Sequence, residues 1–193
     1  MVRPGDVVID AGVSRNCRET FRFAKLVGET GRIFSFEPEP EEFLLAQSQI
    51  EKRNLKQVKM VEKGLWSKNE DLFITKTIES SRVVHAKRGN VSACSLTSLD
   101  IFVEENDLHH VDVIKYDIEG AEMEALAGAE TTIRKFKPVL IICLYHYNED
   151  IYSIPIFLHQ MNLSYKFYIK QGVTRATGTI LFAIPPRIYC NCS

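Results

Sequence analysis

Short hydrophobic runs alternate with amphipathic stretches along most of this chain. The first run, residues 7–9, precedes a polar turn, after which apolar residues recur at helical spacing from Cys17 to Gly28. This order is typical of a strand followed by a helix that buries one face. Similar patterns predict strands at residues 33–36, 58–61, 111–116 and 139–144, and helices at residues 40–50, 98–105, 123–136 and 151–161. The helix that begins at Pro40 is expected to bury Phe43, Leu44, Ala46 and Ile50.

Two segments depart from this alternation. Residues 72–96 hold short β-type runs without helical periodicity, so we expect strands or loops beside the main sheet. Residues 165–169 and 179–184 are strand-like runs joined by a glycine-containing loop, which predicts an antiparallel pair. The whole pattern predicts one α/β domain over residues 1–193, a three-layer αβα sandwich around a mostly parallel sheet with an antiparallel C-terminal hairpin.

Composition and charge narrow the function classes. The chain is 45% hydrophobic and 25% charged, as in ordinary globular proteins. Its net charge of -1 supplies no basic surface for a phosphate backbone, so we expect no nucleic-acid partner. The longest apolar run, residues 139–145, is far shorter than the roughly 20 residues that span a bilayer. Because no apolar signal region opens the chain, we expect a cytoplasmic protein without a membrane partner. The five cysteines are widely spaced and form no CxxC pair, so we expect them to be reduced.

Carboxylates follow two predicted strands at the edge where an open parallel sheet binds ligands. Asp10 precedes Gly12, which lets the backbone approach a ligand, and the next helix N-terminus offers N–H groups. Glu37 and Pro38 follow the second strand, where Glu37 can accept hydrogen bonds from both ribose hydroxyls of a nucleoside cofactor. Each acid also has a structural interpretation, but the two strand ends together favour nucleoside binding.

A third strand end, residues 115–122 (KYDIEGAE), is the most unusual. Charged residues crowd a strand that is otherwise expected to be buried, and unpaired buried charges are costly. Lys115 can neutralise a carboxylate, and Glu119 and Glu122 can be acids favoured by the dipole at a helix N-terminus. Gly120 permits a close packing that a capping role alone does not require.

These segments resemble the FkbM-type S-adenosylmethionine-dependent methyltransferases over nearly the whole chain. The resemblance rests on segments 4–12 (PGDVVIDAG), 36–38 (FEP), 98–100 (SLD) and, above all, 115–122 with its continuation 124–129 (EALAGA). The first two occur in many class I methyltransferases, whereas the 115–122 segment is far more specific. The resemblance implies a Rossmann-like class I fold and O-methylation of a hydroxyl on a sugar or small natural product.

The resemblance also implies a binding site for the cofactor, S-adenosyl-L-methionine. Residues of the first strand end surround the methionine portion, the acid of the second holds the ribose, and residues near 64–66 cover the adenine. The cofactor-binding set is Asp10, Gly12, Ser14, Asn16, Glu37, Pro38, Gly64, Leu65 and Trp66. Where the family usually has Ala-Asn-x-Gly after the first glycine, this chain has Val13-Ser14-Arg15-Asn16.

Methyl transfer to a hydroxyl requires an aligned acceptor and removal of its proton. Asp117, at a strand end, and His146, after the next strand, are the candidate catalytic residues. Their structural alternatives are a partner of Lys115 or of the cofactor amine for Asp117, and an ordinary loop histidine for His146. Glu119 and Glu122 are candidate substrate-binding residues. Asp117, Glu119 and His146 lack a recognised metal-ligand spacing, so no metal is expected.

Two other functions compete with methyl transfer to a small hydroxylated acceptor. A nicotinamide-dependent oxidoreductase is disfavoured because no G-x-G-x-x-G follows the first strand. A degenerate, non-catalytic domain of the same fold is motivated by Asn16 in place of the usual glycine. A homo-oligomer is compatible with the sequence in either case.

Overall fold

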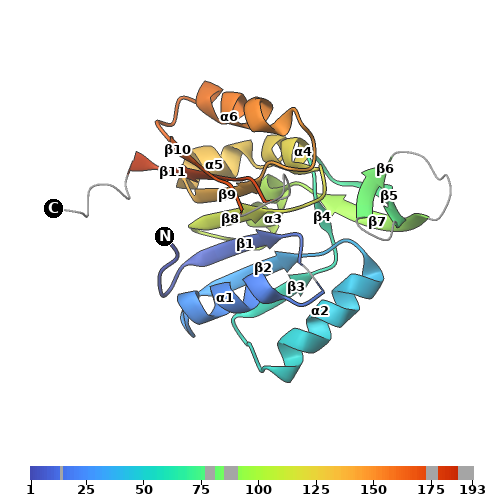
Figure 1. Ribbon diagram of the computed structural model, residues 1–193. Helices are drawn as coiled ribbons and strands as arrows, with labels where there is room; N and C mark the ends of the chain where they lie inside the picture. The colour runs from blue at the N-terminus through green and yellow to red at the C-terminus, as the bar shows by residue number, and fades with distance from the viewer. Residues whose placement is uncertain (14, 77–80, 85–90, 173–177, 187–193) are drawn as a thin grey trace.

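A seven-stranded sheet forms the middle layer of the computed structural model (Figure 1). The structure describes residues 1–13, 15–76, 81–84, 91–172 and 178–186. The strand order is β10-β11-β9-β8-β1-β2-β3, and β11 runs antiparallel to β9 and β10 while the other pairs are parallel. The strands are β1 (Val7–Ala11), β2 (Arg32–Phe36), β3 (Val58–Val61), β8 (Val113–Tyr116), β9 (Val139–Cys143), β10 (Lys166–Lys170) and β11 (Ile180–Ile184). The predicted mostly parallel sheet with a terminal antiparallel pair is confirmed.

Alternating rows of strand residues decide which helices cover each face of the sheet. Val8 pairs with Ile33 and Val113, and this row packs against α1 on one face. Ile9 pairs with Ile114, and the next row packs against α3, α5 and α6 on the other face. Three layers follow, because successive side chains of a strand point to opposite faces. The helices are α1 (Arg18–Val27), α2 (Pro40–Lys52), α3 (Leu99–Glu105), α4 (Glu122–Ala127), α5 (Glu130–Phe136) and α6 (Asp150–Gln160).

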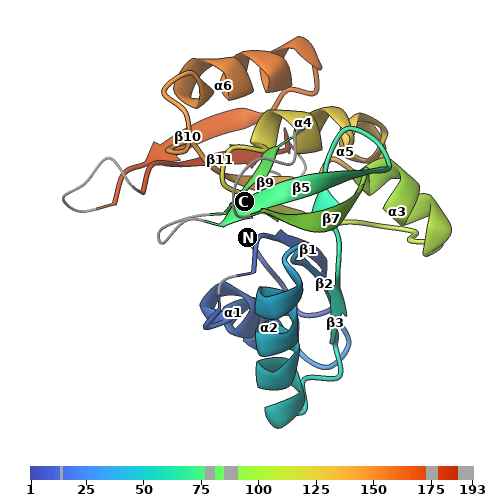
Figure 2. The ribbon, with the colours of Figure 1, turned by 90° about the vertical axis from the view of Figure 1, so that its right-hand side faces the viewer.

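A second sheet of four strands, in the order β4-β7-β5-β6, lies at the carboxyl ends of the main-sheet strands. Figure 2 shows β5 and β7 in front of these strand ends. The strands are β4 (Gly64–Leu65), β5 (Glu70–Lys76), β6 (Ser81–Val84) and β7 (Val91–Thr97). Most of β5, β6 and β7 comes from residues 72–96, for which strands or loops beside the main sheet were expected, whereas β4 precedes that segment. Leu72, Ile74, Cys94 and Leu96 form a small core of their own in this sheet.

The helix predicted over residues 123–136 is two helices, α4 and α5. Gly128, between them, packs so closely that a Cβ atom there would lie 2.0 Å from the carbonyl oxygen of Trp66. The Asp100 carboxylate accepts hydrogen bonds from the N–H groups of Thr131 and Thr132, which lie in the first turn of α5. Contacts with distant segments therefore end the first helix and begin the second. The spacing of the apolar residues along the chain does not predict these contacts.

Leu44 was predicted to be buried in α2 but is 64% exposed. The buried residues of α2 are Ala46 and Ile50, while Phe43 is half-buried. This helix packs beside the edge strand β3, so the stripe of its surface that meets the sheet is narrow. No helix within the described residues is long and apolar enough to cross a membrane.

Candidate active site

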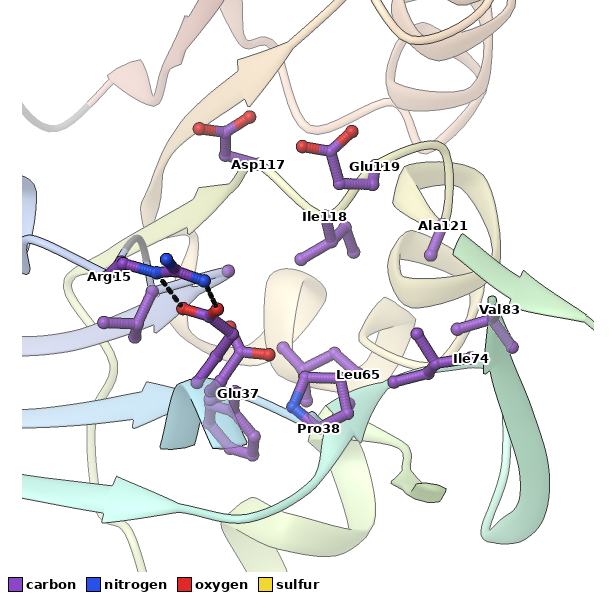
Figure 3. A pocket seen from close by; sticks show the side chains of 15 residues that line it. Arg15, Glu37, Pro38, Leu65, Ile74, Val83, Asp117, Ile118, Glu119 and Ala121 are labelled. Atoms are coloured by element: carbon purple, nitrogen blue, oxygen red, sulfur yellow. Dashed lines mark hydrogen bonds and ion pairs between the residues drawn. The ribbon is translucent and has the colours of Figure 1, made fainter. Parts of the chain in front are cut away.

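A cavity of about 300 Å³ opens at the carboxyl ends of β1, β2 and β8. The chain runs from β1 to β2 and β3 on one side and from β8 to β9 on the other, so this is the switch point where open α/β sheets bind ligands. Asp117, Ile118 and Glu119 lie along one side of the cavity, and Glu37 and Pro38 lie opposite (Figure 3). The predicted site residues that line it are Gly12, Glu37, Pro38, Gly64, Leu65, Asp117 and Glu119.

Gly12 is the point where the ends of β1, β2 and β8 meet. Its φ of 84° lies in the region that favours glycine, and its N–H donates to the carbonyl oxygen of Phe36 at 3.1 Å. A Cβ atom at this position would lie only 1.8 Å from the carbonyl oxygen of Asp117. The absence of a side chain at Gly12 therefore allows the first turn and the loop after β8 to form one wall of the cavity.

Asp10 lies below this wall and is fully buried. It accepts a hydrogen bond from the Thr20 hydroxyl at 2.6 Å, and its other oxygen lies 3.3 Å from Nζ of Lys115. Lys115 also donates to the carbonyl oxygens of Ala11 and Gly12. Burial works to lower the pKa of Lys115, but the carboxylates of Asp10 and Asp117 outweigh it and raise that pKa. Lys115 thus neutralises Asp10 and ties the first turn to β8.

Glu37 reaches the cavity from the end of β2. Its Oε1 accepts a hydrogen bond from the N–H of Glu39 at 3.1 Å. Burial raises the pKa of Glu37 to about 7, although that hydrogen bond opposes the shift. Because this carboxylate is poorly solvated, hydrogen-bond donors of a bound ligand would stabilise its ionised form.

The segment 64–66 divides between the cavity and the second sheet. Gly64 and Leu65 line the cavity, and a Cβ atom at Gly64 would lie 3.3 Å from the ring of Pro38. Trp66 packs against the core of the second sheet and is not among the cavity-lining residues, and its predicted contact with the adenine stays a prediction. Trp66 lies just beyond the end of β4, and its N–H donates to the carbonyl oxygen of Thr97, the last residue of β7, at 2.9 Å.

Asp117 and His146 lie together, as their candidate catalytic roles require. The Tyr145 hydroxyl donates to Oδ1 of Asp117 at 2.6 Å, and Nε2 of His146 lies 3.6 Å from the same oxygen. Nζ of Lys115 lies 4.0 Å from Oδ2. Asp117 therefore has a phenol and two basic side chains around it.

Glu122, a predicted substrate-binding residue, is 1% exposed. Its Oε1 accepts from the N–H of Ile118 and its Oε2 from the N–H of Gly120, while Nδ1 of His146 lies 2.8 Å from Oε1. Burial works to lower the pKa of His146, but Glu122, Glu119 and Asp117 together raise it. In this structure Glu122 holds the loop after β8 and the imidazole in place. A substrate-binding role for Glu122 stays a prediction.

Comparisons with known proteins agree with this geometry. Residues 9–165 match the family described as the Methyltransferase FkbM domain. The chain belongs to the FkbM methyltransferase family. No curated protein matches its sequence.

Solved methyltransferases share the fold of this FkbM-family protein. Methyltransferase FkbM from Methylobacillus flagellatus KT has a TM-score of 0.73 at 18% identity, and the match covers 93% of this chain and 43% of that one. Fibrillarin from Aeropyrum pernix, with natively bound S-adenosyl-L-methionine, has a TM-score of 0.60 at 14% identity over 95% of this chain and 68% of its own. A putative rRNA methylase from Clostridium thermocellum has a TM-score of 0.60 at 16% identity, and the match covers 95% of this chain and 88% of that one. The chain thus spans less than half the length of the Methylobacillus protein.

Sequence reasoning missed part of the wall of this FkbM-family site. Arg15 lies in the turn after β1 and forms an ion pair with Glu42 of α2, and both line the cavity (Figure 3). A basic residue in that turn, opposite the acidic start of α2, was the available signal. The other unpredicted lining residues are Val13, Phe36, Ile74, Val83, Ile118 and Ala121.

One predicted cofactor-binding residue of the first turn, Asn16, does not line the cavity. It is exposed, and Cys17, which follows it at the start of α1, has a left-handed φ of 48°. Ser14 lies outside the described residues. The two residues on either side of Ser14, Val13 and Arg15, do line the cavity.

Proposed function

We propose that this FkbM-family protein transfers the methyl group of S-adenosylmethionine to a hydroxyl of a small acceptor, such as a sugar or natural product. The observation that carries the proposal is the placement of Glu37 and the Gly12 turn in one cavity at the switch point of the sheet. The oxidoreductase alternative is disfavoured because the turn after β1 lacks the G-x-G-x-x-G pattern. The cytoplasmic location and the small acceptor stay predictions.

The donor set of the cavity fits an adenosyl sulfonium ligand. Glu37 supplies the acceptor oxygens that a ribose diol needs, and Gly12 leaves its backbone open where a side chain would stand. Gly64 and Leu65 supply a small apolar surface beside Pro38. When bound, S-adenosylmethionine supplies a methyl group on a positively charged sulfur, and the carboxylates of Asp117 and Glu119 suit that charge.

The remaining tasks fall to residues of this chain. The cavity must hold the acceptor in line with the carbon–sulfur bond, because alignment supplies much of the rate of a displacement. Ile74 and Val83, from β5 and β6, close the apolar side of the cavity and can exclude water from it. A carboxylate or imidazole at the opposite side accepts the hydroxyl proton.

The proposal is tested by titration calorimetry of the purified protein with S-adenosylmethionine. Saturable binding at one site supports it, whereas the absence of binding favours the non-catalytic alternative. A panel of hydroxylated sugars and small natural products, assayed for S-adenosylhomocysteine release, then tests the O-methylation. Demethylated cofactor formed only with amine or thiol acceptors would contradict that part of the proposal.

We expect Glu37→Gln to weaken cofactor binding about tenfold at pH 8, because an amide accepts weaker hydrogen bonds than a carboxylate. In the ligand-free protein the pKa of Glu37 is raised to about 7. The carboxylate is the binding form, so wild-type affinity is complete about one unit above pH 7 and falls at lower pH until it levels off, about tenfold weaker, once Glu37 is protonated. The variant lacks this dependence. Calorimetry between pH 5.5 and 8.5 measures both effects.

A stability measurement separates this binding role from a structural one. A carboxylate whose pKa is raised in the folded state destabilises that state once it ionises, so Glu37→Gln should not lower the unfolding temperature at pH 8. Glu62→Gln, an exposed acid after β3, is the control and should change neither binding nor its pH dependence. A Glu37→Gln protein with wild-type affinity would refute the ribose assignment.

A further inference from the structure

Glu119 has a backbone conformation that few residues other than glycine adopt. Its φ is 57°, and Gly120, the next residue, has a φ of 99°. The Glu122 carboxylate holds this loop by accepting the N–H groups of Ile118 and Gly120, one on each side of Glu119. Left-handed non-glycine residues cost free energy and are concentrated at functional sites. The buried Glu122 therefore stabilises one particular placement of the Glu119 side chain.

Packing of the next loop supports the same placement. A Cβ atom at Gly120 would lie 2.4 Å from the ring of Tyr147, so the loop after β9 presses directly on the loop after β8. The Arg82 guanidinium of β6 lies over the ring of Tyr147, 5.2 Å from its centre. Three separate segments thus meet around Glu119.

The carboxylates of Glu119 and Asp117 differ in how they are engaged. Asp117 accepts a hydrogen bond from Tyr145 and lies near Lys115 and His146. Glu119 lies 3.7 Å from Nε2 of His146, and its side chain is 40% exposed on the cavity wall. Burial raises the pKa of Glu119, with Asp117 and Glu122 adding to the rise and His146 and Arg82 opposing it. The Glu119 carboxylate, partly exposed on the cavity wall, can come within hydrogen-bond reach of an acceptor hydroxyl, as a general base must.

We propose that Glu119 is the general base of the reaction, and that Glu122 and His146 are positioning residues that hold it at the methyl-transfer position. The proposal rests on the proposed methyltransferase function. It assigns Asp117 a different task, as a fixed anion held by Tyr145 and Lys115. It therefore replaces the expected catalytic role of Asp117 and gives His146 an indirect one.

The methyl transfer moves one proton to Glu119 and leaves one electron pair on sulfur. Glu119 takes the proton of the acceptor hydroxyl while the hydroxyl oxygen forms a bond to the methyl carbon. The carbon–sulfur bond breaks, and its electron pair stays on sulfur, which becomes a neutral thioether. Glu119 is left as a carboxylic acid and returns the proton to solvent through its exposed side.

An inhibitor comparison tests this assignment without an identified acceptor. Sinefungin carries an ammonium group on carbon where S-adenosylmethionine carries the methylated sulfur, whereas S-adenosylhomocysteine has no charge there. Calorimetry measures the affinity ratio of these two ligands for wild type, Glu119→Gln and Asp117→Asn. The control is Glu124→Gln, an exposed acid on α4 outside the cavity lining.

We expect wild type and Glu124→Gln to prefer sinefungin, and Glu119→Gln to reduce that preference about tenfold, because a charge-assisted hydrogen bond is lost. Affinity for S-adenosylhomocysteine should stay within about twofold of wild type in Glu119→Gln. An unchanged preference in Glu119→Gln, or an equal or larger loss in Asp117→Asn, would overturn the assignment. If wild type binds neither ligand, the proposed function itself fails.

Discussion

Lys115→Met is expected to lower the free energy of unfolding by about 3–5 kcal/mol. Methionine has a similar length and can fill the same space, but it leaves the fully buried Asp10 carboxylate without its cation. It also removes the two hydrogen bonds that Nζ donates to the carbonyl oxygens of Ala11 and Gly12. Breaking a buried ion pair by removing one partner costs much more than removing both partners.

Urea unfolding followed by circular dichroism measures this loss. The double variant Asp10→Asn, Lys115→Met should recover more than half of it, because no uncompensated charge stays in the core. Lys68→Met removes a lysine whose side chain is 67% exposed and lies 3.5 Å from Glu70, and should cost less than about 1 kcal/mol. A double variant as unstable as Lys115→Met would show that the ion pair is not the reason for the loss.

The second large effect is expected from Gly12→Ala, at about 2–5 kcal/mol of unfolding free energy and about 100-fold in cofactor affinity. The new Cβ atom would lie 1.8 Å from the Asp117 carbonyl oxygen, and its position is fixed by the backbone just as that of the carbonyl oxygen is. Neither can rotate away, so the first turn and the loop after β8 must separate. That separation opens the wall on which Asp117 and Glu119 lie.

Gly28→Ala is the matched control for this prediction. Gly28, at the end of α1, has a φ of 67°, but a Cβ atom there would meet nothing within 4 Å. It should therefore show only the cost of backbone strain, about 1–3 kcal/mol, and keep its affinity for S-adenosylmethionine. Thermal unfolding and calorimetry on both variants give the comparison. If Gly12→Ala bound the cofactor as well as Gly28→Ala does, the close contact with Asp117 would not matter for the site.

The 115–122 segment, which carries the resemblance to the FkbM family, has a physical explanation in the structure. Lys115 neutralises Asp10 beneath the cavity, and Glu122 holds the following loop through backbone N–H groups. Gly120 leaves room for Tyr147. These three residues support the cavity wall, while Asp117 and Glu119 line it. Lys115 and Glu122 of this charged segment are thus paired with groups inside the protein.

Most of the fold was predictable because it depends on local spacing. The run at residues 7–9 became β1, the run at residues 33–36 became β2, and the strand-like runs at the end became an antiparallel pair. The features that could not be predicted depend on contacts between distant segments. Asp100 and Trp66 divide one amphipathic stretch into two helices, although nothing in the spacing of its apolar residues shows a break.

The sequence by itself determined the α/β class, the edge of the sheet at which the cavity opens, and the presence of Gly12, Glu37 and Asp117 at that edge. Period-two and period-3.6 patterns report which local segments bury a face, and parallel strand ends always meet at one edge. Only the tertiary structure decided that Asp10 is buried beneath Lys115, that Trp66 faces the second sheet, and that Glu122 is enclosed while Glu119 is accessible. Carboxylates of the same type in the same segment acquire different roles because burial and pairing are set by residues far away in the chain.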